Sequence, residues 1–259
     1  LEEFVGMKMF RRTRRGVALT AAGVRYSRAI RARLDEVERD TLALMSSGGA
    51  GGSIELAVVP TFATHWLIPR LGAFRLKNPA IAVNLHVHTR AFLFSQTGMD
   101  AAVHASAGGW PGTRADKLMD EEMTIVCSQS LWPHRSQPSA RAVAKLPLIQ
   151  MTTRPYAWRE WFSAQGLEIE GDMVGDRMEL FSMATQAAAH GLGVALLPRF
   201  FVERELESGE LVVLIDKTFQ SGLSYYLIHP EGDEIATTFQ VFREWVLAQA
   251  QEYATRLSP

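Results

Sequence analysis

The sequence is poor in several features that would point to other kinds of protein. Its 259 residues include one cysteine, Cys127, which excludes an internal disulfide framework and makes the cytoplasm the expected compartment. It has no run of about 18 apolar residues, so we expect no membrane span. Leu1–Phe4 lacks the apolar core of a secretion signal. An initiator methionine is also missing, from which we expect further residues upstream.

Motifs of catalysis are missing as well. The sequence has no G-x-S-x-G elbow, no H-E-x-x-H pair, no C-x-x-C and no P-loop. Gly191 and Gly193 lie between a predicted helix and a predicted strand, where Gly191 fits a helix cap. Cys127 lies in an apolar stretch and is interpreted as a buried, inert thiol. His86 and His88 fit a solvent-facing pair better than a metal site. We therefore expect no enzyme, no cofactor and no metal.

Positive charge is concentrated at the N-terminus. Residues 1–33 hold nine lysines and arginines against two acidic residues, whereas the remaining 226 residues hold 18 basic and 26 acidic side chains. A basic head on an acidic body suggests a polyanionic partner for the head, such as nucleic acid. A solvated basic arm would give the same count.

The first 52 residues are predicted to form a hairpin and a long helix. Met7–Phe10 and Val17–Leu19 have the composition of strands on either side of a polar turn. Thr20 is a good N-cap for a helix over Ala21–Met45. A heptad stripe runs along this helix, formed by Ser27, Ile30, Leu34, Val37, Thr41 and Leu44. Such a stripe needs a partner. The partner is either the same helix of a second chain, which the charged residues on the other faces favour, or the chain's own body.

A glycine-rich segment, Ser46–Ser53, separates this head from a body in which strands and helices alternate. Strands are predicted at 54–59, 81–88, 101–105, 123–127, 147–151, 173–177, 194–197, 211–214 and 225–229. Helices are predicted at 67–77, 155–165, 179–190, 199–207 and 234–253. This alternation is typical of a mostly parallel α/β sheet with helices on both faces, and about 200 residues leave room for two lobes.

Three stretches of the chain resemble the LysR-type transcriptional regulators. Leu1–Gly23 resembles the end of the family's recognition helix, its wing and the beginning of its linker helix. Val59–Pro79 resembles the first strand, ligand turn and helix of the sensor domain. Gly191–Pro198, followed by Glu205–Val212, resembles a later part of that domain. Arg154–Trp158 resembles the subgroup typified by the glycine-cleavage activator.

The resemblance implies a DNA-binding transcription factor in three parts. These are a remnant of a winged helix-turn-helix (residues 1–19), a linker or dimerisation helix with a hinge (20–52) and a two-lobed, periplasmic-binding-protein-like effector domain (53–259). Lobe I would combine 53–126 with 229–259, and lobe II would span 127–228. The protein would be a cytoplasmic homodimer or homotetramer that regulates transcription in response to a small-molecule effector bound between the lobes.

The resemblance also implies how DNA is contacted. The family's upstream helices, which read bases in the major groove, are absent from this sequence. The wing residues are expected to touch phosphates without reading sequence, and they are Lys8, Arg11, Arg12, Arg14 and Arg15. A stand-alone solute-binding protein is the alternative, because periplasmic binders share the two-lobed fold. The basic wing and the long helix argue against it.

The effector site is expected at the carboxyl ends of the strands. Ligands of open α/β sheets lie there, beside helix N-termini whose free N–H groups attract anions, so we expect an anionic effector. The residues expected to bind it are Thr61, Phe62, Thr89, Arg90, His104, Ala105, Thr152, Thr153, Trp158, Ser182 and Met183. Three of them have ordinary alternatives: Thr61 as a helix cap, Arg90 as a solvated side chain and Trp158 as part of the core.

Overall fold

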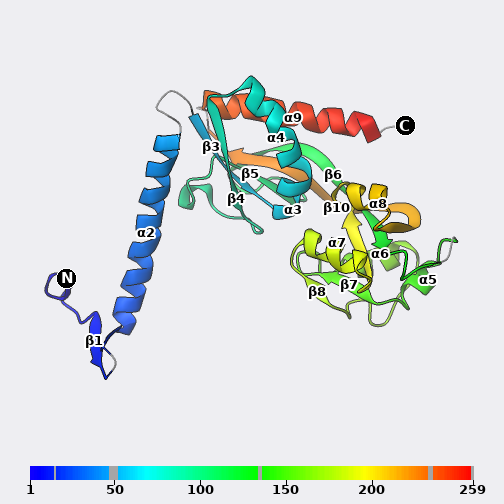
Figure 1. The fold of residues 1–259 in the computed structure, drawn as a ribbon, viewed down its shortest axis with the longest axis horizontal. Helices are drawn as coiled ribbons and strands as arrows, with labels where there is room; N and C mark the ends of the chain where they lie inside the picture. The colour runs from blue at the N-terminus through cyan, green and yellow to red at the C-terminus, as the bar shows by residue number, and fades with distance from the viewer. Residues whose placement is uncertain (15, 47–51, 134–135, 233–235, 258–259) are drawn as a thin grey trace. The chain divides into compact units, whose positions relative to one another are not determined.

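The computed structural model of the chain describes residues 1–14, 16–46, 52–133, 136–232 and 236–257. It divides into two compact units (Figure 1). The first comprises Leu1–Ser53 with Ala80–Ala82, and the second comprises Ile54–Pro79 with Val83–Pro259. Arg15 and residues 47–51 of the predicted linker lie outside the described residues.

The first unit is a short helix, a hairpin and a long helix. Its elements are α1 (Glu2–Val5), β1 (Phe10–Thr13), β2 (Gly16–Leu19) and α2 (Ala21–Ser46). The prediction that Met7–Phe10 forms the first strand is wrong for its first three residues. The Glu2 carboxylate accepts hydrogen bonds from the N–H groups of Met9 and Phe10 (2.6 and 2.9 Å), which holds this segment away from a strand partner.

Thr20 caps α2 as predicted and also ties the helix to the hairpin. Its hydroxyl accepts a hydrogen bond from the Gly23 N–H (3.1 Å) and donates one to the Lys8 carbonyl (2.8 Å). A Cβ on Gly23 would lie 2.2 Å from the Met9 carbonyl oxygen, so only glycine permits this close approach.

The second unit is built on an eight-stranded sheet in the order β4-β3-β5-β10-β6-β9-β7-β8. Its strands are β3 (Gly52–Val58), β4 (Ile81–Val87), β5 (Ala101–Ser106), β6 (Thr113–Cys127), β7 (Leu148–Met151), β8 (Arg177–Met178), β9 (Val194–Pro198) and β10 (Val212–Pro230). The sheet is mixed and not mostly parallel. β3 pairs with β5, and β7 with β8 and β9, in parallel, whereas β10 is antiparallel to β5 and β6, and β6 is antiparallel to β9.

Two long strands join two lobes of this sheet (Figure 1). The first lobe contains β3, β4 and β5, the second contains β7, β8 and β9, and β6 and β10 belong to both. The sequence predicted 211–214 and 225–229 as separate strands, but β10 runs through both. It stays paired with β6 across register shifts between Ile215 and Ser224. The antiparallel pair of long strands is the crossing between the lobes, and it is what makes the sheet mixed.

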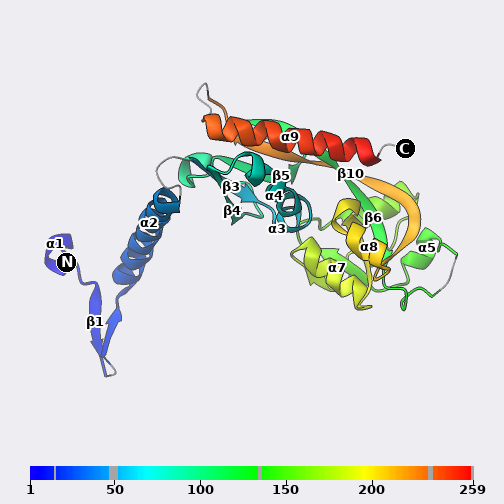
Figure 2. The same ribbon diagram turned by 45° about the horizontal axis from the view of Figure 1, so that its top comes forward.

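Helices cover the lobes. α3 (Pro60–Phe62) and a π-helical turn η1 (Ala63–Leu67) lead into α4 (Ile68–Lys77), which packs on the C-terminal helix α9 (Thr237–Leu257) through Phe74 and Phe242 (ring centroids 5.5 Å apart). Figure 2 shows α9 lying along the first lobe. The second lobe carries α5 (Ala140–Val143), α6 (Ala157–Ala164), α7 (Phe181–Ala189), the 3-10 turn η3 (Arg199–Phe201) and α8 (Glu203–Ser208).

Two further predictions are corrected in the second lobe. The predicted strand 173–177 is a turn that ends in the two-residue β8, because the chain passes too close to β7 for any side chain. Gly175 has φ +138°, and a Cβ on it would lie 1.9 Å from the Leu148 carbonyl oxygen. The predicted helix 199–207 is broken into η3 and α8 at Val202, whose φ and ψ of –122° and 8° are not helical.

Candidate functional site

The ends of the parallel strands meet at one edge of the first lobe. The Val59 N–H donates to the Val103 carbonyl and the His88 N–H donates to the Val58 carbonyl, so β3, β4 and β5 end side by side. The N-terminus of α7 and the loop after β7 face this edge from the second lobe. Between them lies a cleft that holds about 50 Å³, and among the residues lining it are Thr61, Thr89, His104, Ala105, Thr153, Arg154, Phe181 and Tyr225.

A direct hydrogen bond joins the lobes across the cleft. Thr61, in the turn after β3, is buried, and its hydroxyl accepts from the Ser182 N–H at 3.3 Å. Ser182 lies in the first turn of α7, where backbone N–H groups have no partner within the helix. The threonine hydroxyl therefore occupies a position suited to a ligand oxygen.

A buried ion pair lies beside this hydrogen bond, at the crossing strands. Arg154 donates from Nε and Nη2 to the two carboxylate oxygens of Glu121 at 2.8 and 2.7 Å, and the Tyr225 hydroxyl donates to the same carboxylate at 3.0 Å. The Glu121 side chain is fully buried, and that of Arg154 is 15% exposed. Arg154 is the one lysine or arginine among the described residues that line the cleft, and its charge is therefore already neutralised.

This pairing perturbs the titration of its members. Burial acts to lower the pKa of Arg154, but the hydrogen bonds and the charge of Glu121 outweigh burial and raise it, so the guanidinium stays charged. Burial, together with the Glu121 charge, raises the pKa of Tyr225 well above its ordinary value, so its hydroxyl stays a donor.

Aromatic rings form the base of the cleft. Phe62 stacks on Tyr225 with ring centroids 5.3 Å apart, and Phe181 contacts Phe201 at 5.6 Å. Arg154 lies 5.7 Å from the centre of the Phe181 ring. The polar groups of the cleft therefore rest on an apolar layer, which is typical of small-molecule sites.

The structure brings together only part of the residue set expected from sequence. Thr61, Thr89, His104, Ala105 and Thr153 line the cleft, and Ser182 reaches it through its N–H. The other five lie elsewhere. Arg90, Thr152 and Met183 are exposed and are not among the lining residues, and Phe62 is fully buried beneath Tyr225. Trp158 is 3% exposed and donates its ring N–H to the Ile149 carbonyl (2.9 Å), so it is part of the core of the second lobe.

Sequence reasoning missed Arg154 and Tyr225, which line the cleft, and Glu121, the buried carboxylate that both of them contact. Arg154 was noticed only as part of a family resemblance, and Glu121 is the middle residue of an acidic run, Asp120–Glu122. Tyr225 is the first residue of the predicted strand 225–229. The one available signal was the strand alternation around Glu121, which sets it on the face opposite to its two acidic neighbours.

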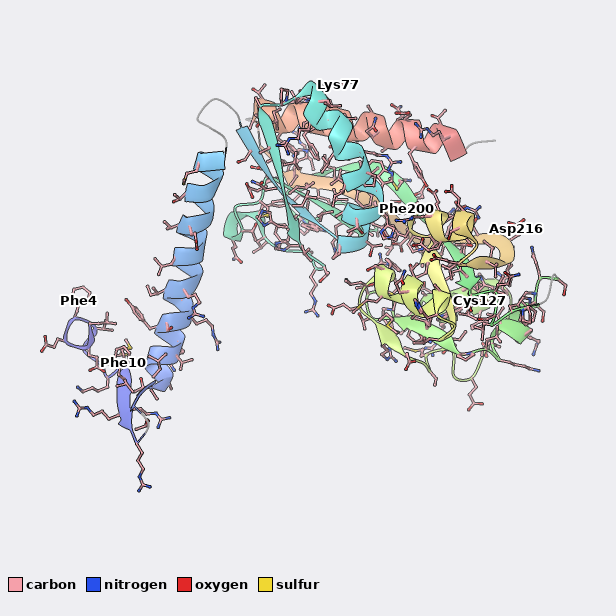
Figure 3. The ribbon with its side chains drawn as sticks, viewed as in Figure 1. Phe4, Phe10, Lys77, Cys127, Phe200 and Asp216 are labelled. Atoms are coloured by element: carbon pink, nitrogen blue, oxygen red, sulfur yellow. The ribbon has the colours of Figure 1, made fainter. Side chains whose placement is uncertain are left out.

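The remaining candidates for chemistry are accounted for by packing. Cys127 is fully buried in the second lobe (Figure 3), and burial raises the pKa of its thiol to about 11. His86 bonds Glu55 at 2.6 Å instead of facing solvent freely. No group of three metal-ligating side chains occurs within the described ranges. No helix in that part of the chain is both long and apolar enough to cross a membrane.

In the first unit the predicted DNA-contacting side chains lie on the hairpin and just before it. Arg11, Arg12 and Arg14 are exposed, and Lys8 is exposed and lies 3.5 Å from Glu2. These exposed basic side chains of the hairpin form a surface that a polyanion can approach.

Comparisons with known proteins agree with this architecture. The family model of the LysR substrate binding domain matches residues 47–251. The glycine cleavage system transcriptional activator of Escherichia coli (strain K12) is 31% identical over 251 residues, which cover 96% of this chain and 82% of that protein. The HTH-type transcriptional regulator PerR of the same strain is 30% identical over 249 residues, covering 95% of this chain and 82% of PerR.

Solved structures show the same fold. The effector domain of the transcriptional regulator AmpR of Pseudomonas aeruginosa superposes with a TM-score of 0.71 at 26% identity, covering 80% of this chain and all of that one. The full-length Vibrio cholerae activator AphB superposes with a TM-score of 0.66 at 20% identity and covers 95% of this chain and 86% of AphB.

Proposed function

This chain belongs to the LysR family of transcriptional regulators, and from that membership we propose that the cleft between its lobes is where a small molecule controls its action on DNA. The observation that carries the proposal is the Thr61–Ser182 hydrogen bond, which joins the lobes at the point where strand ends face a helix N-terminus. The protein acts as a ligand-responsive regulator in the cytoplasm, where its DNA is, and not as a catalyst.

The effector changes the arrangement of the lobes. The cleft holds about 50 Å³, whereas sites for small metabolites measure roughly 300–1,000 Å³, so the lobes must separate to admit a ligand. A ligand that fits one lobe arrangement better than another shifts the population toward it. The crossing strands β6 and β10 are the elements that bend, and their register shifts between Ile215 and Ser224 mark where pairing is already irregular.

The effector is a small anionic metabolite such as an amino acid. Arg154 is neutralised by Glu121, so a carboxylate is held mainly by neutral donors: the Thr61 hydroxyl and the Ser182 N–H at the start of α7. It replaces the Thr61 oxygen as the acceptor of the Ser182 N–H. The aromatic layer under the cleft accommodates the apolar part of such a ligand.

The wing and the long helix serve DNA binding. Lys8, Arg11, Arg12, Arg14 and Arg15 contact phosphates, which gives affinity that falls with salt but carries no sequence information. Helix α2 exposes Ile30, Leu34 and Val37 on one heptad stripe, and the stripe is covered by the same helix of a second chain, which pairs the DNA-binding heads. A homodimer, or a tetramer built from two of them, is the working form.

Thermal-shift screening against a panel of amino acids and related carboxylates tests the cleft, because a ligand that binds only the folded state raises the melting temperature. We expect at least one compound to stabilise the protein and Thr61→Val to remove that shift. Thr255→Val is the matched control, since the Thr255 hydroxyl bonds the Gln251 carbonyl on the surface of α9. A shift that survives Thr61→Val, or is lost in both variants, would contradict the site.

A further inference from the structure

A second and larger cavity lies against the crossing strands. It holds about 600 Å³, well within the range of small-molecule sites, roughly 300–1,000 Å³. Its walls come from β6 and β10, from η3 and α8 of the second lobe, and from the C-terminal half of α9, which belongs to the first lobe. Figure 3 shows Phe200, one of its lining residues, where the chain passes between the lobes. We call it the back cavity.

Among the described residues, the back cavity and the cleft have no lining residue in common. Successive side chains of a strand point to opposite faces. In β6, Glu121 faces the cleft residues Arg154 and Tyr225, whereas its neighbours Asp120 and Glu122 line the back cavity. The two sites are therefore lined by different residues, although Phe200 of the back cavity contacts Tyr225 of the cleft.

The carboxylates that line the back cavity are already engaged. Asp120 pairs with Lys117 (2.6 Å) and accepts from the Ser224 hydroxyl (2.7 Å). Glu122 accepts from the Thr218 hydroxyl at 2.5 Å, and Glu203 accepts from the Tyr253 hydroxyl.

Arg199, a cation that lines the back cavity, differs from these carboxylates. Within the described part of the chain, the Arg199 guanidinium has no hydrogen bond or ion pair, although the residue is only half-exposed in the cavity wall. A half-buried guanidinium with five free donors is a ready partner for a planar anion.

The rest of the wall is largely apolar. Leu247 and Ala250 of α9, Met119 of β6 and Phe200 of η3 all line the cavity. Burial and the hydrogen bond to Glu203 raise the pKa of Tyr253, which keeps its hydroxyl neutral in this wall.

We propose that the back cavity is a second small-molecule site, which binds an amphipathic monoanion with its carboxylate or sulfonate on Arg199 and its aromatic or alkyl body against α9. The ligand differs from that of the cleft, because the guanidinium among the described cleft residues, that of Arg154, is paired with Glu121 and the volume of the cleft is smaller by an order of magnitude.

Such a ligand is coupled to the cleft. Both sites are lined by elements of both lobes, so a movement of the lobes that opens the cleft also changes the shape of the back cavity. A ligand that fits the back cavity better in one arrangement favours that arrangement, and coupling between two binding sites is reciprocal. Phe200 provides a direct contact, because it lines the back cavity and packs edge-to-face on Tyr225 of the cleft (5.3 Å).

Calorimetric titration of the full chain with 2-naphthoate, a fluorescent aromatic carboxylate, tests the site. We expect saturable binding that Arg199→Gln weakens by about tenfold or more, the loss of one charge-assisted contact. Arg204→Gln is the matched control, because Arg204 is exposed on α8 and is not among the lining residues. It should change the affinity by less than about twofold. Leu247→Trp, which fills the cavity, should abolish binding.

A neutral isostere separates charge recognition from simple apolar uptake. 2-Naphthamide should bind the unmodified protein about tenfold more weakly than 2-naphthoate, and Arg199→Gln should not affect it. Three results would each overturn the proposal. The first is no saturable binding of naphthoate, and the second is equal affinity of the Arg199→Gln and Arg204→Gln proteins for it. The third is naphthoate binding that is lost in Thr61→Val but kept in Arg199→Gln. The last result would place naphthoate in the cleft.

Discussion

Replacing Arg154 with methionine tests how much the buried Arg154–Glu121 ion pair contributes to the free energy of unfolding. The substitution leaves Glu121, a carboxylate with no solvent exposure, without its cation. Removing one partner of a buried ion pair costs about 3–5 kcal/mol, because the remaining charge stays buried and uncompensated. The Tyr225 hydroxyl still donates to Glu121 at 3.0 Å, so we expect a loss near the lower end, about 3 kcal/mol. That is a large share of a typical unfolding free energy of about 5–15 kcal/mol.

Urea unfolding followed by tryptophan fluorescence measures this loss. All six tryptophans lie between Trp66 and Trp245, so the signal reports on the lobes and not on the wing or α2. Arg256→Met is the control, because Arg256 pairs with Glu252 on the exposed face of α9 and should leave the midpoint unchanged.

A second substitution decides whether the buried charge is the cause. Combining Arg154→Met with Glu121→Leu removes both charges and should restore much of the lost stability, because an apolar pair of similar volume replaces a buried ion pair at little cost. If Arg154→Met costs less than about 1 kcal/mol, or if the double variant is less stable than the single one, the reasoning about the uncompensated carboxylate fails.

Three further changes test other parts of the molecule. Gly23→Ala should loosen the wing from α2, because its Cβ would meet a backbone carbonyl at 2.2 Å, and trypsin should then cut the wing several-fold faster. Gly72→Ala places its Cβ in open space in α4 and should raise the free energy of unfolding of the lobes by about 0.5–1 kcal/mol. If both glycine substitutions were stabilising, or both destabilising, the contacts inferred around these two positions would be wrong. Cys127, whose thiol pKa burial raises to about 11, should resist Ellman's reagent at pH 8 until urea unfolds the chain; rapid labelling of the native protein would refute its burial. Leu34→Lys should shift sedimentation from dimer to monomer, whereas Ala29→Lys, off the heptad stripe, should not; equal sedimentation of the two would remove the stripe from the interface.

Much of the architecture followed from local patterns in the sequence. Apolar stretches located β3, β5, β7 and β9, strict alternation located β4, and the Thr20 cap located the beginning of α2. Polar residues directly after strands predicted the cleft at Thr61 and Thr153, because strand ends meet at one edge of a parallel sheet. The strands and the helix cap are confirmed, because a single element and its neighbours in sequence contain the information, whereas binding of an effector at Thr61 and Thr153 stays a prediction.

Other features depended on residues that are distant in sequence. The predicted strands 211–214 and 225–229 are one strand, because β6 pairs with both across an irregular register that no local pattern reveals. Trp158 and Phe62 look like ligand contacts in sequence, yet tertiary packing buries them in the core and beneath Tyr225.

The sequence by itself determined the family, the strand ends that form the cleft and the basic wing, because these depend on residue type and on spacing over a few turns of chain. The tertiary structure alone decided the charge of the cleft. Glu121 and Arg154 lie 33 residues apart, and only the folded crossing brings them to 2.7 Å. Coulomb energy depends on distance and burial rather than on position in sequence, so local patterns do not reveal that the charge of Arg154 is already compensated.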